Sequence, residues 1–126
     1  MRKEYDTIAT IERDGFTILV EKTWEDIHPK DMFDDSCYDI KEMCNKIDCG
    51  VLDWFMLRIR VLVDEFELAS DYLGGCLYED AREVLTDGTA EDLISEALSD
   101  AKSQVHRVYK QFQTLSFALD REGVEC

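Results

Sequence analysis

The segment VLDWFMLRIRVLV, residues 51–63, decides the fold class of this chain, because apolar side chains alternate with more polar ones along it. The apolar positions are Phe55, Leu57, Ile59, Val61 and Val63, and the positions between them are Trp54, Met56, Arg58 and Arg60. A period of two residues predicts a β-strand with one face in a core and the other partly in water. On the wetter face we expect the arginines to lay their stems over Trp54 and to pair with acids of a neighbouring strand.

A return strand is expected directly after this segment. Asp64-Glu65 would turn the chain, and the strand would run through 66–72 and continue over 76–78, so that strands occupy residues 51–78. Gly74-Gly75 interrupts the return strand and favours a bulge or a bend there.

Residues 6–22 predict a β-hairpin. Two apolar-rich segments flank Asp14-Gly15, which is a favoured two-residue turn between strands with a right-handed twist. With these residues as the loop, Ile11 lies opposite Ile18, and the hairpin gains one apolar face that needs a cover.

Short helices are predicted at two places. Residues 24–35 have the polar composition of a surface loop, and residues 37–47 then predict a helix with Ser36 as its N-cap and Gly50 after its end. A second short helix is expected over 80–87.

A long helix is predicted over residues 90–119, with Thr89 and Asp92 as its start signal. Its apolar residues recur at helical spacing, and the stripe they form is expected to lie on the sheet. They are Ile94, Ala97, Leu98, Ala101, Val105, Val108, Phe112, Leu115 and Leu119. Such a helix runs roughly 45 Å, longer than a domain of this size usually spans. We therefore expect its second half to pack on a partner subunit, which would make a homodimer through the long helix.

Together these elements predict a single α+β domain over residues 1–126. It would hold an antiparallel sheet of about four strands, a short helix and one long C-terminal helix packed on one face. A chain of 126 residues is large enough to bury a core without a metal or a disulfide.

The net charge of −15 restricts the partners of this chain. Such a field repels nucleic acid, anionic lipid and nucleotide phosphates, and it attracts basic proteins. The N-terminal residues lack the apolar run of a signal peptide, and no stretch approaches the roughly 20 apolar residues of a membrane span. We expect a soluble, intracellular protein that binds neither nucleic acid nor membrane directly.

Most of the charge lies in residues 61–100, which hold twelve acids and one base, Arg82. Rows of carboxylates can stand in for DNA phosphates in a groove lined with Lys and Arg, so we predict these acids as partner-binding residues. They are Asp64, Glu65, Glu67, Asp71, Glu79, Asp80, Glu83, Asp87, Glu91, Asp92, Glu96 and Asp100. Asp92, Glu96 and Asp100 share one helix face at intervals of about 6 Å, which costs rather than adds helix stability. The alternative is a solvated face, with acids early and bases late as the helix dipole favours.

The five cysteines include no C-x-x-C pair and predict reduced thiols. A zinc site built from Cys37, Cys44, Cys49 and His28 is the less favoured reading, since cysteines also serve as small packing residues. Cys76 has acids rather than a base or cation nearby, so we expect it to be buried and inert.

Other chemical sites have little support in the sequence. A phosphate cradle at Gly74-Gly75 would need a helix start and a lysine, whereas Glu79 and Asp80 follow. His106 belongs to no metal-binding or catalytic motif and is expected on the helix surface. We therefore predict no catalytic residue, no metal and no cofactor.

The run from Trp54 through DYLGGC (71–76) and Tyr78, followed by an acidic helix with the core LISEAL (93–98), resembles small acidic proteins encoded by bacteriophages and prophages. The resemblance covers roughly residues 50–100, and Leu77 departs from the serine that is usual at that position. It implies a phage or mobile-element protein in the cytoplasm of a bacterial host. Some proteins of this kind resemble DNA-mimicking inhibitors of restriction or CRISPR effectors.

The function expected from these observations is non-enzymatic binding of a basic, nucleic-acid-handling host protein, such as a nuclease or a CRISPR effector, as an anti-CRISPR-like inhibitor. One alternative is a phage accessory or immunity-type module that recognises its partner by shape, with the acids serving solubility only. The other is a small enzyme or a metal protein.

Overall fold

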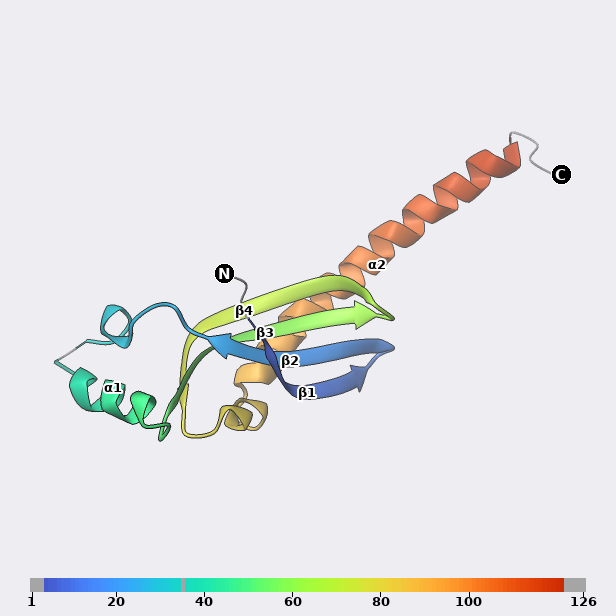
Figure 1. The fold of residues 1–126 in the computed structure, drawn as a ribbon. Coiled ribbons are helices and arrows are strands. Elements are labelled where there is room, and N and C mark those ends of the chain that lie inside the picture. The colour runs from blue at the N-terminus through green and yellow to red at the C-terminus, as the bar shows by residue number, and fades with distance from the viewer. Residues whose placement is uncertain (1–3, 35, 122–126) are drawn as a thin grey trace.

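The computed structural model describes residues 4–34 and 36–121 of the chain. A four-stranded antiparallel sheet in the order β1-β2-β3-β4 carries one long helix, so the predicted α+β fold is confirmed (Figure 1). The strands are β1 (Asp6–Arg13), β2 (Phe16–Trp24), β3 (Asp53–Val63) and β4 (Phe66–Tyr78). The helices are α1 (Ile40–Asp48) and α2 (Thr89–Arg121), with 3-10 turns η1 (Pro29–Asp31) and η2 (Ala81–Leu85).

The hairpin between β1 and β2 has the predicted two-residue turn. Asp14 and Gly15 adopt φ values of 56° and 86°, in the left-handed region that aspartate tolerates and glycine favours. The turn sets the register, because Ile11 pairs with Ile18 as the sequence predicts. The apolar face of the hairpin then points into the core.

A bulge lies in β4 at the glycine pair, where the sequence predicts a bulge or a bend. Phe55 pairs with Cys76 and Leu57 pairs with Leu73, so two glycines of β4 stand against one residue of β3. The strand continues through the bulge as one element, and the local change of direction carries its last residues towards η2.

The core lies between one face of the sheet and the first half of α2. Its largest fully buried side chains are Phe55, Ile18, Leu57, Ile59, Ile94, Val20, Val61 and Val84. The alternating residues of β3 are therefore core residues as predicted, except Val63, which is 39% exposed because it directly precedes the β3–β4 turn.

The helix α1 begins later than predicted. Asp39, not Ser36, is the N-cap, since its side chain accepts a hydrogen bond from the backbone N of Glu42 at 3.0 Å. The backbone N–H of Ser36 donates instead to Oδ1 of Asp34 at 2.9 Å, which holds this segment in a turn. The prediction of a helix from residue 37 with a Ser36 cap is wrong for this reason.

The short helix expected over residues 80–87 is the 3-10 turn η2. Asp80 caps it by accepting a hydrogen bond from the backbone N of Arg82 at 2.9 Å. The chain then reverses at Gly88, whose φ of 94° favours glycine, and Asp87 accepts from the backbone N of Thr89 at 2.9 Å where α2 starts.

The helix α2 lies on the sheet along its first half only. Its buried apolar residues are Ala90, Leu93, Ile94, Ala97, Leu98 and Ala101. Lys102 Nζ donates to Oδ2 of Asp14 in the β1–β2 turn at 2.8 Å, so the sheet ends at this level and the rest of α2 projects beyond it (Figure 1). The expectation that the whole apolar stripe lies on the sheet is wrong past Ala101. Across the described ranges, no helix combines the length and apolar character that crossing a membrane requires.

Candidate functional site

The twelve predicted partner-binding acids occupy separate parts of the fold. Three lie at or just after the β3–β4 turn: Asp64, Glu65 and Glu67. Four surround η2, at the other end of β4: Glu79, Asp80, Glu83 and Asp87. The others lie on α2 and on the part of β4 beside it: Asp71, Glu91, Asp92, Glu96 and Asp100. Each group therefore has to be judged by its own neighbours.

Several of these acids have structural partners. Ion pairs join Glu91 to Arg13 at 2.7 Å, Glu67 to Arg60 at 3.8 Å and Asp80 to Arg82 at 3.7 Å. The hydrogen bond and charge of Arg13 lower the pKa of Glu91. Asp87 accepts a hydrogen bond from the hydroxyl of Tyr78 at 2.5 Å, which lowers the pKa of this carboxyl. These carboxylates are already engaged within the molecule.

Four acids form the least compensated group, which we call the acidic flank: Asp71, Asp92, Glu96 and Asp100. Within the part of the chain that the structure describes, no ion pair joins any of them to a base. The pKa of Glu96 is raised, first by a hydrogen bond to the carboxylate of Asp71 and then by the charges of Asp71, Asp100 and Asp92. The flank is thus a site of mutual repulsion that a cation would relieve.

The position of Asp71 in this group follows from strand register. Asp71 pairs with Ile59, and directly opposed residues of an antiparallel pair point to the same face of the sheet. Ile59 is fully buried on the face that α2 covers, and β4 is the edge strand. Asp71 therefore emerges at the rim of the sheet, beside Glu96 on α2. Helical spacing alone groups Asp92, Glu96 and Asp100 and does not place Asp71 with them.

Two bases form ion pairs on the side of α2 that faces the β1–β2 hairpin, away from the acidic flank. Arg13 binds Glu91 through both guanidinium Nη atoms, at 2.7 Å and 3.2 Å, and Lys102 binds Asp14. Both pairs fasten the β1–β2 hairpin to α2, and both involve exposed side chains, so each adds little stability by itself. Because both bases are engaged there, neither of them neutralises the carboxylates on the side of α2 that faces β4.

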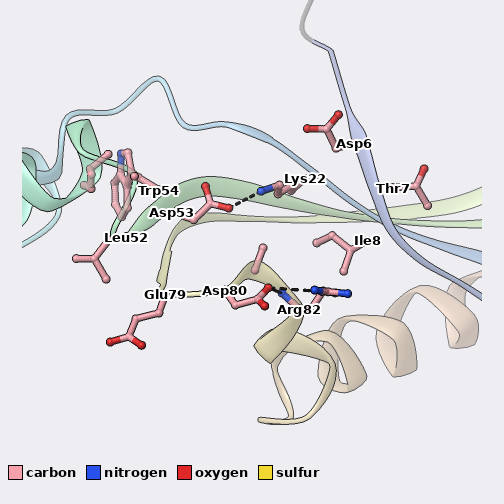
Figure 2. Close-up of a pocket in the computed structure, with 13 residues that line it drawn as sticks. Asp6, Thr7, Ile8, Lys22, Leu52, Asp53, Trp54, Glu79, Asp80 and Arg82 are labelled. Carbon is pink, nitrogen blue, oxygen red and sulfur yellow. Dashed lines mark hydrogen bonds and ion pairs between the residues drawn. The ribbon is translucent and has the colours of Figure 1, made fainter.

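A cavity of about 690 Å³ opens between β1, the start of β3, the end of α1 and η2 (Figure 2). Its charged lining residues are Asp6, Lys22, Asp53, Glu79, Asp80 and Arg82. Lys22 pairs with Asp53, and Arg82 pairs with Asp80. Among the described lining residues the one hydroxyl is that of Thr7, and no histidine or cysteine lies in the lining with it.

The glycine pair has a structural role. The backbone N–H of Gly75 donates to Oε1 of Glu25 at 2.7 Å, so a carboxylate of the chain itself occupies the place where an anion would bind. Gly75 adopts a φ of 67°, and a Cβ there would lie 2.8 Å from Sδ of Met32. The bulge therefore packs against the segment that follows β2, a contact between distant parts of the chain that the local sequence does not reveal.

On the sheet face opposite α2, Arg58 and Arg60 pair with an acid of the neighbouring strand, as predicted. Glu21 on β2 accepts from Nε of each arginine at 2.8 Å, and its side chain is only 6% exposed. Burial alone would raise the pKa of Glu21, but hydrogen bonds from Arg60 and Arg58 outweigh it and lower the pKa. The aromatic cover is Tyr5, whose ring centroid lies 3.3 Å from Cζ of Arg58.

The prediction that the arginine stems cover Trp54 is wrong. The ring of Trp54 lies 5.7 Å from that of Phe33, and its Nε1 donates to the carbonyl of Ile27 at 2.9 Å. Trp54 thus anchors the loop after β2 instead. The physical reason is that a partly buried indole N–H needs a hydrogen-bond acceptor, and the carbonyl of Ile27 in that loop supplies one.

The cysteines show no metal centre in the residues that can be described. Sγ of Cys44 lies 3.9 Å from Nε2 of His28, but no group of three or more His, Cys, Asp or Glu side chains within 4–34 and 36–121 is placed to hold a metal ion. Cys76 is buried, and burial raises the pKa of its thiol to about 11. Such a thiol is protonated at neutral pH and is a poor nucleophile.

Comparison with known proteins adds no relative to this picture, since no family model, no curated protein and no solved structure matches the chain.

Proposed function

We propose that this protein is a non-enzymatic binding protein of a phage or mobile element, acting in the cytoplasm of a bacterial host. Its partner in this proposal is a basic, nucleic-acid-handling host protein, such as a nuclease or a CRISPR effector. The protein would occupy the nucleic-acid groove of that partner as a DNA mimic. The observation that carries the proposal is the acidic flank, in which four carboxylates stand together and form no ion pair with a base among the described residues.

The geometry of the flank supports this reading. Asp92, Glu96 and Asp100 repeat every four residues of a helix, which spaces their carboxylates by about 6 Å along its axis. Duplex DNA presents phosphates every 3.4 Å along each strand, so this row offers a groove lined with Lys and Arg a little over half the linear charge density of one DNA strand. Asp71 widens the row to a second element and raises the pKa of Glu96.

The net charge of −15 supports the same reading through association kinetics. A field of this strength steers a basic partner towards the molecule and raises the association rate at low ionic strength. It also disfavours a direct complex with nucleic acid. Binding of this type weakens as salt is added, whereas recognition by shape alone would not depend strongly on salt.

The test uses three versions of the purified chain as bait in a nuclease-treated bacterial lysate. They are the natural chain, the flank variant Asp92→Asn/Glu96→Gln/Asp100→Asn, and the control Asp31→Asn/Glu42→Gln/Asp48→Asn, which removes the same charge from η1 and α1. We expect a captured basic protein with the natural chain and the control but not with the flank variant. The identified partner, once purified, should then be displaced by duplex DNA and by added salt. Equal capture by all three versions would contradict the proposal.

A further inference from the structure

The projecting half of α2 carries apolar side chains that the domain does not cover. We call residues 102–119 the arm. Its exposed large apolar residues include Val105, Tyr109, Phe112, Leu115 and Leu119, with exposures between 41% and 64%. Beyond the ion pair of Lys102 with Asp14, the arm projects away from the sheet (Figure 1). An isolated helix of this length is only marginally stable in water, so a covering partner would stabilise the arm as a helix.

The apolar residues of the arm follow a heptad pattern. Successive positions are separated by three and four residues in strict alternation: Val105, Val108, Phe112, Leu115 and Leu119. This is the spacing of the a and d positions of a coiled coil, with Val105, Phe112 and Leu119 at a and Val108 and Leu115 at d. The same register continues back through Ala101, Leu98 and Ile94, which the sheet already covers. We call this row of a and d positions the seam. Up to Ala101 it packs on the sheet, and beyond Ala101 the sheet no longer covers it.

We infer that the arm pairs with the arm of a second copy of this chain as a short antiparallel coiled coil. An antiparallel arrangement brings a positions against d positions, which gives the layers Val105–Leu115 and Val108–Phe112, each formed twice about a two-fold axis. Every layer then combines a small β-branched side chain with a larger one. A parallel pair would instead place Phe112 against Phe112 and Val105 against Val105.

The distribution of charge selects the same orientation. The arm holds three bases, Lys102, Arg107 and Lys110, and no acid, so the rest of the chain carries more than the whole net charge of −15. A parallel pair would bring two strongly acidic domains side by side. An antiparallel pair separates them by the arm, roughly 27 Å for 18 residues, which is several times the Debye length of about 8 Å at physiological salt.

The area of the seam sets the expected strength of the dimer. Aromatic side chains bury about 150–250 Å² each, so the exposed apolar residues of the arm offer on the order of 500 Å² per chain. A symmetric pair then buries on the order of 1,000 Å², close to the lower limit for a specific interface. We expect a reversible dimer with a dissociation constant on the order of micromolar.

The experiment measures mass by sedimentation velocity over a dilution series of the full chain. Phe112→Glu places a charge in the centre of the seam, and Gln113→Glu places the same charge on the next residue, outside the seam. We expect the natural chain and Gln113→Glu to dimerise alike, and Phe112→Glu to weaken dimerisation at least tenfold. Since Phe112 is 64% exposed, the domain should still unfold at an unchanged temperature.

Orientation and salt dependence complete the test. Small-angle scattering of the dimer should give an elongated particle with the two domains at its ends. Added salt should not weaken dimerisation, because the seam is apolar and the acidic domains lie several Debye lengths apart. It weakens the carboxylate-dependent binding proposed above, so the two ideas fail separately. The inference is overturned by a monomer at all concentrations, by equal dimerisation of both variants, or by a compact particle with adjacent domains.

Discussion

Asp71 on β4 and Glu96 on α2 lie close enough for the side chain of Asp71 to raise the pKa of Glu96, first through a hydrogen bond and then through its charge. The strand places Asp71 on the face that α2 covers, and helical spacing adds Asp92 and Asp100 to the same flank. An inward-pointing charge on an edge strand also discourages pairing with the edge of another sheet. Asp71 therefore has a structural role at the edge of the sheet and a proposed binding role in the acidic flank.

The raised pKa of Glu96 predicts a specific dependence of stability on pH. The folded chain holds this proton more tightly than the unfolded chain does, so the stabilisation is fully present below the ordinary pKa of a glutamate. It is lost as pH rises through the raised value. Glu96→Gln should thus reduce the fall in Tm between acidic and neutral pH, measured by thermal unfolding. Asp48→Asn, an exposed change of equal charge, should leave that fall unchanged, and identical curves for all three chains would refute the assignment.

Glu21 is expected to stabilise the sheet by neutralising two arginines. Glu21→Gln leaves Arg58 and Arg60 adjacent without their shared carboxylate, and Arg60 keeps only the longer pair with Glu67 at 3.8 Å. This should cost about 3 kcal/mol of unfolding free energy, at the low end of the range for broken buried pairs. The low end applies because the side chains of Arg58 and Arg60 are 17% and 26% exposed, so water partly solvates their charges. Denaturant unfolding measures the change. The exposed control Glu12→Gln should stay within about 0.5 kcal/mol of the natural chain, and an equally small effect of Glu21→Gln would count against the role.

The bulge predicts different costs for two glycine substitutions. Gly75 and Gly50 both have positive φ, at 67° and 80°, so an alanine at either should cost about 1–2 kcal/mol in backbone strain. Gly50 has open space around an added Cβ, whereas Gly75 faces the side chain of Met32. Gly75→Ala should therefore cost slightly more, because the end of the flexible Met32 side chain has to shift, and Met32→Ala in the same chain should remove this small excess. Equal unfolding free energies for Gly75→Ala and Gly50→Ala would show that the contact does not matter.

The thiols should differ sharply in reactivity. Cys76 is buried and its pKa is raised to about 11, mainly by desolvation, so an alkylating reagent should leave it unmodified in the folded chain at neutral pH. Cys37 and Cys49 are exposed and should react readily. Mass spectrometry after a timed reaction measures this, with denatured protein as the control in which Cys76 also reacts. Modification of Cys76 at the rate of Cys49 in folded protein would contradict its burial.

Much of the fold is predictable from local sequence. The β1–β2 turn, the alternating strand β3 and the long helix each depend on side chains a few residues apart, and the structure places them close to the predicted bounds. The predicted start of α1 is wrong because the backbone N–H of Ser36 donates to Asp34, and Asp39 caps the helix instead. Two capping residues with similar intrinsic preferences competed there, and the sequence pattern did not distinguish them.

Local pattern thus determined the secondary structure and the abundance of acid, since periodicity, turn chemistry and charge are properties of neighbouring residues. Tertiary structure alone decided which acids are paired, through contacts such as Glu91 with Arg13 and Asp71 with Glu96. It also decided where α2 leaves the sheet, because that point depends on how far the β1–β2 turn reaches along the helix, to Lys102. The distance between the β1–β2 turn and α2 depends on strand register and on how α2 packs on the sheet. No single segment of the sequence specifies either of these.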